Sequence, residues 1–133
     1  MEKPHKKLDV WQKSMQLVVD VYEAAGKFPK VEGYALTEQV RRSVVSIPSN
    51  IAEGAARRSR KEFIQHLSVA QGSLSELDTQ MELGNRLGWV TEETSKLVNE
   101  QMQQVDKMLC GLLQYHKGKL QHEIRKKRKS ENE

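Results

Sequence analysis

The chain has 133 residues with 8 glycines and only 3 prolines, a composition that suits a single helical domain better than a loop-rich or all-β fold. Its formal net charge is +4, no apolar run approaches the ~20 residues of a membrane-spanning helix, and the first residues lack the apolar segment of a secretory signal. We therefore expect a cytoplasmic protein without membrane contact, and the single cysteine, Cys110, fits a reducing compartment.

Hydrophobic periodicity predicts four helices, of which two lie in the first half of the chain. The first runs from about residue 8 to 25, and a turn follows around Pro29 and Gly33. The second covers about residues 35–57, with apolar side chains every three or four positions on both sides of Pro48. Proline lacks an N–H and crowds the carbonyl four residues earlier, so we expect this helix to be kinked at Pro48 and not ended there.

The other two helices have recognisable start signals. Ser59 followed by Glu62 is a capping box that opens the third helix, which is expected to end near Gly88 with a left-handed cap. Thr91 then opens the fourth helix. Short connections between long helices favour antiparallel neighbours. The predicted fold class is therefore all-α, an up-down-up-down antiparallel four-helix bundle with a kinked second helix.

Small polar side chains form a stripe along the second helix, comprising Ser43, Ser46, Asn50, Glu53 and Arg57. One interpretation places Ser46, Asn50 and Glu53 in a buried structural polar network that satisfies the break at Pro48. In the alternative interpretation, Glu53 is exposed and pairs with Arg57 one helical turn later.

Two glycines, Gly72 and Gly84, lie inside the third helix, where each costs about 1 kcal/mol relative to alanine. Close approach of another helix, from the same or a neighbouring subunit, would offset this cost. The alternative is that both are tolerated surface glycines.

Positive charge is concentrated in two parts of the chain. Residues 117–133 hold seven Lys/Arg and three Glu, a net +4, so the remaining 116 residues, with 15 charges of each sign, are neutral. We divide the chain into a bundle of residues 1–116 and a basic C-terminal tail of residues 117–133, interpreted as a mobile arm. Phosphate neutralisation dominates non-specific nucleic-acid affinity. The candidate nucleic-acid-binding residues are Arg41, Arg42, Arg57, Arg58, Arg60, Lys61, Arg125, Lys126, Lys127, Arg128 and Lys129.

An alternative explanation of the body arginines requires no ligand. Glu38 with Arg42 and Glu53 with Arg57 are favourable pairs one turn apart, each worth about 0.2–0.5 kcal/mol. Arg41 and Arg57 lie about 160° apart around a straight helix, so they do not form one stripe. These charges would then be solvated or bridge subunits.

Catalytic and metal-binding patterns are absent from the sequence. Glu62 and His66 are four residues apart, whereas a di-iron bundle requires Glu-x-x-His pairs on two helices. The sequence also lacks a Gly-x-Ser-x-Gly elbow and a phosphate-binding glycine loop. We predict no catalytic residue, no metal and no cofactor, and hence no enzyme.

Several segments together resemble a known family. In chain order they are Leu8–Trp11, Phe28–Leu36, Gln39–Ser43, Ser46–Gly54 (SIPSNIAEG) and Ala70–Leu77. Over roughly residues 8 to 116 the chain resembles the bacterial four-helix-bundle family first noticed as reading frames in intervening sequences of 23S ribosomal RNA genes. The family is related to the accessory variability proteins of diversity-generating retroelements.

The resemblance implies a homo-oligomeric helical bundle, most specifically a pentameric ring, with nucleic-acid binding suspected and no established reaction. We therefore predict a non-enzymatic accessory module that binds the backbone of RNA or DNA. The alternative is a protein-interaction scaffold, for example a partner of a reverse transcriptase, with no direct contact to nucleic acid.

Overall fold

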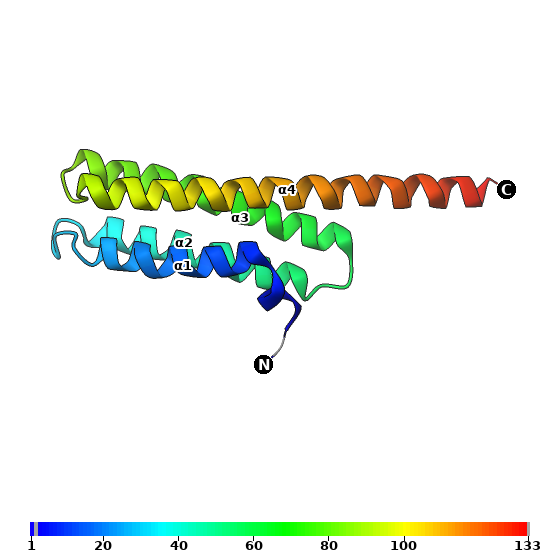
Figure 1. Cartoon of the computed structure of the whole chain (residues 1–133), viewed down its shortest axis with the longest axis horizontal. Helices are drawn as coiled ribbons and strands as arrows, with labels where there is room; N and C mark the ends of the chain where they lie inside the picture. The colour runs from blue at the N-terminus through cyan, green and yellow to red at the C-terminus, as the bar shows by residue number, and fades with distance from the viewer. Residues whose placement is uncertain (2, 133) are drawn as a thin grey trace.

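The structure is a computed structural model, and it describes residues 1 and 3–132. A short 3-10 helix, η1, precedes four α-helices. The elements are η1 Pro4–Lys7, α1 Asp9–Ala25, α2 Tyr34–Ala55, α3 Arg60–Arg86 and α4 Glu92–Glu131. Each helix packs against the next one in the chain, and α1 also packs against α4, which closes the bundle (Figure 1). The predicted all-α four-helix bundle is confirmed.

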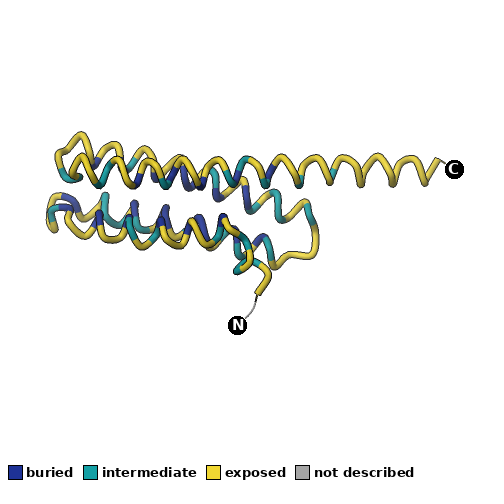
Figure 2. Tube along the Cα trace, viewed as in Figure 1, coloured by how far each residue is buried: buried dark blue, intermediate teal, exposed yellow. Residues whose placement is uncertain are grey.

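The core is built from aliphatic side chains that all four helices direct inward (Figure 2). Their spacing of three or four residues along each helix is the pattern that the sequence predicts for bundle packing. The largest fully buried side chains are Leu17, Val21, Val40, Val44, Ile47, Ile51, Leu67, Leu77, Val98, Val105 and Leu109.

Pro48 lies inside α2, which continues through it for seven more residues to Ala55. Its ring is buried with Val44, Ile47 and Ile51 on the same helix. Tertiary packing on both sides of the proline therefore keeps the helix continuous, as the apolar pattern around it predicts.

Local signals define the ends of α3 and α4. The Ser59 hydroxyl accepts a hydrogen bond from the Glu62 N–H at 3.0 Å, and the Thr91 hydroxyl accepts one from the Thr94 N–H at 3.1 Å. Just after α3, Gly88 adopts a φ of 78°, the left-handed conformation expected at this position. The three predicted helix-terminal signals are thus confirmed.

The two glycines of α3 have different surroundings. A Cβ on Gly84 would lie 3.0 Å from Cζ of Phe28, so the close approach comes from the α1–α2 connection of the same chain. The Phe28 ring in turn packs on Trp89, with ring centroids 5.6 Å apart. A Cβ on Gly72 would meet nothing within 4 Å, which agrees with the surface alternative.

Helix α4 is much longer than the bundle that it belongs to. Its last buried residue is Leu113, yet the helix continues to Glu131, a further ~27 Å at 1.5 Å per residue. Figure 2 shows most of this end of the helix as exposed, and the structure describes His116 and Leu120 as partly buried. We call residues 117–131 the α4 extension. The described part of this segment is helical and continuous with the bundle.

Among the residues that the structure describes, no helix combines the length and the apolar character that crossing a bilayer requires.

Helices α2 and α3 approach each other closely at Gly54. A Cβ on this glycine would lie 2.7 Å from Cβ of His66 and 2.9 Å from Cδ1 of Phe63, both on α3. Such distances are shorter than van der Waals contact, and the Cβ of His66 cannot move without the α3 backbone. Glycine at position 54 is therefore a packing requirement of the α2–α3 pair.

We predict that Gly54→Ala destabilises the protein by about 1–3 kcal/mol, because the added methyl group overpacks the helix interface. Gly72→Ala is the matched control, since it is also a mid-helix glycine but faces open space. It should stabilise the protein by about 0.5–1 kcal/mol through helix propensity. Urea unfolding followed by circular dichroism measures both changes, and equal effects of the two substitutions would contradict this account of Gly54.

Candidate nucleic-acid interface

A polar network links α2 to α3 within about four helical turns of their connecting loop. The hydroxyls of Ser46 and Ser73 lie 2.8 Å apart, and Asn50 Nδ2 donates to the Ser46 carbonyl at 2.9 Å and to its hydroxyl at 3.0 Å. Asn50 Oδ1 is 3.1 Å from Nδ1 of His66. Because an amide oxygen only accepts, this ring nitrogen of His66 carries the proton and donates it.

This network includes two of the three residues proposed for it from the sequence, namely Ser46 and Asn50. Glu53 is the exception, since its carboxylate accepts a hydrogen bond from Arg57 at 2.9 Å and its side chain is 54% exposed. We correct its assignment to the network. The third and fourth members are Ser73 and His66 of α3. They could not be identified from the spacing of residues on α2 alone.

Four of the predicted basic residues lie where α2 connects to α3, in residues 56–61, which include the first two residues of α3 and which we call the α2–α3 loop. Arg57, Arg58, Arg60 and Lys61 surround Ser59, the N-cap of α3, and line one side of a groove of about 700 Å³. The other side of this groove comes from η1 and α4, through Pro4, Leu8, His116, Leu120 and Glu123. The first N–H groups of α3 add partial positive charge at the same place. We call this cavity the basic groove.

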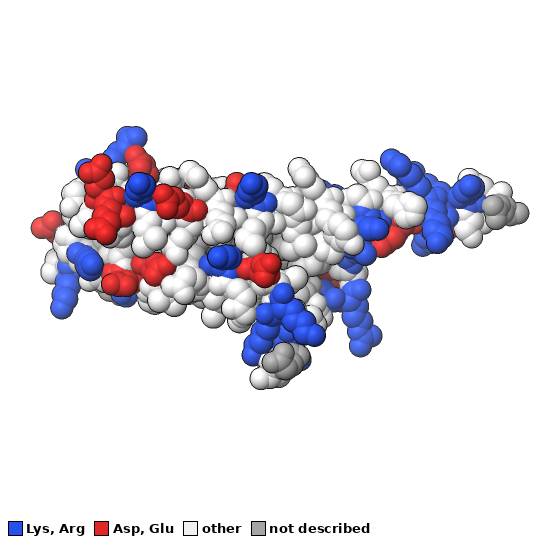
Figure 3. Space-filling view, in the orientation of Figure 1, with Lys and Arg blue, Asp and Glu red and all other residues white. Residues whose placement is uncertain are grey.

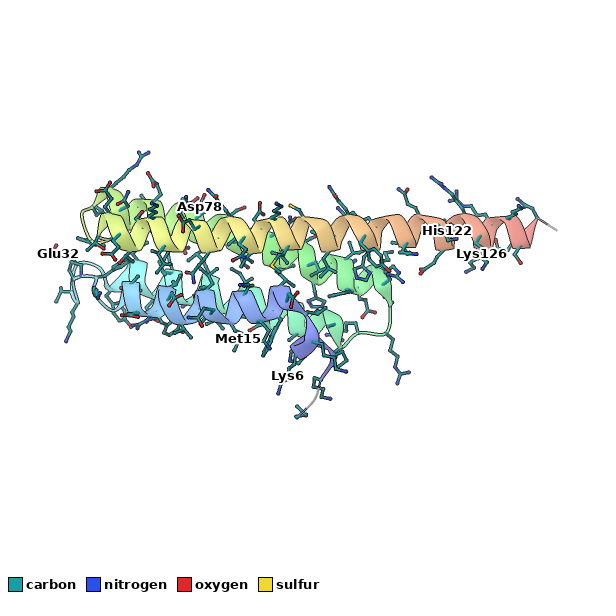
Figure 4. The ribbon with its side chains drawn as sticks, in the orientation of Figure 1. Lys6, Met15, Glu32, Asp78, His122 and Lys126 are labelled. Atoms are coloured by element: carbon teal, nitrogen blue, oxygen red, sulfur yellow. The ribbon has the colours of Figure 1, made fainter. Side chains whose placement is uncertain are left out.

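Charge is distributed unevenly along the bundle. Figure 3 shows Lys and Arg gathered around the N-terminus and along the α4 extension, whereas Asp and Glu gather at the opposite end among several Lys and Arg. Figure 4 places Lys6 and Lys126 toward the first end and Asp78 toward the second. The basic groove lies at the positive end. A second groove of about 400 Å³ at the other end is lined by Asp78, Glu82 and Glu92, and it repels a phosphate backbone.

Arg60 is the basic residue of the loop that contacts α4. Its Nε donates to Oε1 of Glu123 at 2.9 Å, and an Nη donates to Nδ1 of His116. The His116 ring also packs edge-on against Phe63, with centroids 4.8 Å apart. Burial lowers the pKa of the His116 imidazole below its usual 6.5, Arg60 lowers it further, and Glu123 acts in the opposite direction. A neutral ring agrees with its role as an acceptor from Arg60.

The remaining loop cations are more accessible. Arg57 pairs with Glu53 and lies 3.9 Å from Glu62, with its side chain 46% exposed. Arg58 and Lys61 are exposed, and they form no ion pair among the described residues.

Arg41 and Arg42 do not reach this groove. They lie about 22–24 Å from Arg57 along α2, at 1.5 Å per residue. The Arg41 guanidinium lies over the Tyr22 ring, 5.1 Å from its centroid, and its Nε is buried without a hydrogen-bond partner. Arg42 is exposed beside Ser43 and Glu76. The predicted pair of Arg42 with Glu38 is not formed among the described residues.

Sequence reasoning missed the parts of the groove that come from other elements. His116, Leu120 and Glu123 belong to α4, more than 50 residues after the loop, so their proximity is a consequence of the bundle topology. The basic residues after Pro4, which include Lys6 and Lys7, are recognisable in the sequence. Their position beside the α2–α3 loop could not be predicted from the sequence. Within the described residues, no group of three or more His, Cys, Asp or Glu side chains is arranged to hold a metal ion.

The architecture and the basic groove define a small helical-bundle protein whose one end is suited to bind anions. The family model described as 23S rRNA-intervening sequence protein matches residues 6–111. The chain belongs to this family. A comparison with curated proteins finds no significant match.

A solved structure similar to this chain comes from Bacteroides thetaiotaomicron VPI-5482 and is described as a protein of unknown function from the S23 ribosomal protein family. The two chains share 26% sequence identity with a TM-score of 0.73. The similarity covers 78% of this chain and 97% of the other. The family model ends at residue 111, so the α4 extension and the groove residues His116 and Glu123 lie beyond it.

We predict that Asn50→Ala destabilises the protein by about 1–3 kcal/mol, because it leaves the partly buried Nδ1–H of His66 without its acceptor and removes the amide donor to Ser46. Glu53→Ala should cost less than about 0.5 kcal/mol, since it removes only an exposed ion pair. The two residues lie one turn apart on the same helix, which makes them a matched pair for urea unfolding. A near-zero effect of Asn50→Ala would show that the network does not stabilise the α2–α3 interface.

Proposed function

We propose that this protein is a non-enzymatic accessory module that binds the backbone of RNA or DNA at its basic end. The observation that carries the proposal is the basic groove, where Arg57, Arg58, Arg60 and Lys61 face the α4 extension. Electrostatic attraction to phosphates is independent of sequence, so a surface of this kind binds nucleic acid without reading bases.

The α4 extension supports the same proposal. Residues 125–129 are five consecutive Lys or Arg residues on an exposed helix, and they lie beyond the groove on the same element. A helix presents such residues in all directions around its axis, so at least some of them face any strand that enters the groove. The groove and the extension together place most of these basic residues at one end of the molecule.

We further propose that the protein works as a homo-oligomer, with a pentameric ring as the specific expectation. On α1, the side chains of Met15, Val19 and Tyr22 follow one another at spacings of four and three residues and are 41%, 59% and 39% exposed. Apolar side chains at this spacing are typical of a helix that packs against another helix. A ring would bring several basic ends together and multiply their attraction to one nucleic acid.

We predict that binding to single-stranded or duplex oligonucleotides weakens steeply with salt. Each neutralised phosphate contributes about 0.7–0.9 to the slope of log affinity against log salt concentration. Removal of residues 117–133 should lower this slope, and replacement of Arg57, Arg58 and Lys61 by glutamine should lower it further. Fluorescence anisotropy at several salt concentrations measures these slopes.

The control is the replacement of Lys96 and Lys107 by glutamine, which removes two positive charges from α4 outside the basic groove and should leave the slope nearly unchanged. Absence of binding by the intact protein at low salt would contradict the proposal. It would favour the protein-interaction scaffold, whose partner would be a protein such as a reverse transcriptase.

We predict a solution mass near five times the 15.3 kDa of one chain. Multi-angle light scattering at micromolar concentration measures this mass. Val19→Glu, which places a charge in the middle of the exposed stripe of α1, should reduce it because the charge would be buried in the contact. A mass of about one chain for the unmodified protein would contradict the ring.

A further inference from the structure

Arg60 differs from the other cations of the α2–α3 loop because both of its hydrogen-bond partners belong to α4. Glu123 Oε1 lies 2.9 Å from its Nε, and the His116 ring accepts from an Nη. Its side chain is only 28% exposed, compared with 46% for Arg57. Arg60 therefore forms part of the wall of the basic groove, and its guanidinium is already bound to the Glu123 carboxylate.

The carboxylate of Glu123 occupies a position that a phosphate oxygen also suits. Carboxylate and phosphate are both anionic acceptors for the planar donor fork of arginine, and they bind it with similar geometry. His116 takes one of the remaining N–H groups and holds the guanidinium in place from its neighbour on α4. The Arg60 side chain is thus preorganised to bind an anion at its Nε edge.

Glu123 is also able to leave this position without a large penalty. Its side chain is 52% exposed, and Arg60 is its ion-pair partner among the described residues. If the carboxylate turns toward solvent, water replaces the lost hydrogen bond, and no buried polar group is left unpaired. An incoming phosphate that replaces it restores the charge balance at Arg60.

We propose that Arg60 is a phosphate-binding residue of the basic groove, and that the Glu123 carboxylate occupies its guanidinium until a nucleic-acid phosphate displaces it. This inference rests on the proposed function. Binding by the unmodified protein exchanges one anion for another at Arg60, so this residue adds little net affinity. When the Glu123 carboxylate is removed, the contact between Arg60 and phosphate contributes fully to the binding affinity.

The test compares Glu123→Gln with Glu131→Gln in the full-length protein. Both substitutions remove one negative charge from the α4 extension, but Glu131 forms no ion pair among the described residues. With a 20-nucleotide single-stranded RNA or DNA as the probe, Glu123→Gln should lower Kd by about tenfold, the order of one charge-assisted contact. Glu131→Gln should change Kd by less than about twofold, as expected for an exposed charge.

A second pair of variants identifies the residue that gains the contact. If Arg60 is that residue, Glu123→Gln should leave Kd nearly unchanged in an Arg60→Gln background, because the two substitutions are coupled. Circular dichroism of each variant verifies its helix content, and Glu123→Ala repeats the test if the glutamine variant is less helical.

Equal effects of Glu123→Gln and Glu131→Gln would overturn this inference and leave the proposed function standing. A decrease in Kd caused by Glu123→Gln that is also seen in the Arg60→Gln background would overturn this inference and leave the proposed function standing. If neither the unmodified protein nor any variant binds the probes at low salt, the proposed function fails, and this inference fails with it.

Discussion

The close contact of α2 with α3 at Gly54 is the constraint on which the rest of the structure depends. The missing Cβ at Gly54 lets the α2 backbone lie against His66 and Phe63, and no larger residue fits there without moving α3. The hydrogen bonds among Ser46, Asn50, His66 and Ser73 then fix how the two helices are aligned along their length. A purely aliphatic interface would permit sliding by one turn, whereas these donors and acceptors are satisfied in one alignment.

That alignment determines where the basic groove forms. Helix α2 ends at Ala55, one residue after the close contact, and α3 begins at Arg60. The connecting residues are therefore held at one end of the bundle, where α4 passes them on its way to the extension. Phe63 illustrates this connection, since it contacts Gly54 on one side and packs against the His116 ring on the other. The same residues therefore stabilise the α2–α3 pair and shape the basic groove.

The electrostatic layout follows from the same arrangement. The molecule has a basic end because the α2–α3 loop and the α4 extension meet there, and an acidic end because acidic residues of α3 and α4 gather near the α3–α4 connection. Long-range attraction of a polyanion depends on such separation more than on net charge. A molecule of +4 with mixed charges over its whole surface would attract a phosphate backbone much less strongly than this one.

Much of the fold was determined by the sequence alone. The helix-period pattern, the caps at Ser59 and Thr91 and the left-handed glycine at position 88 are local features, which depend on neighbours within a few residues. The continuity of α2 through Pro48 was also predictable, because apolar residues flank the proline at helical spacing on both sides. The helical state of residues 117–131 was not anticipated, since consecutive like charges alone indicate a solvated segment and the helix propagates into it from the packed part of α4.

Only the tertiary structure decided which residues of the candidate site lie together. Arg41 lies on α2 and Arg57 follows two residues after the end of that helix, yet Arg41 is stacked on Tyr22 while Arg57 lines the groove. Arg60 is more than 50 residues before His116 and Glu123 in sequence, and the antiparallel return of α4 brings both of them into contact with it. The spacing of residues within one helix shows only which of them share a face of that helix. Contacts between helices depend on their relative alignment. At the α2–α3 interface, this alignment is set by partly buried hydrogen bonds and by the missing Cβ of Gly54.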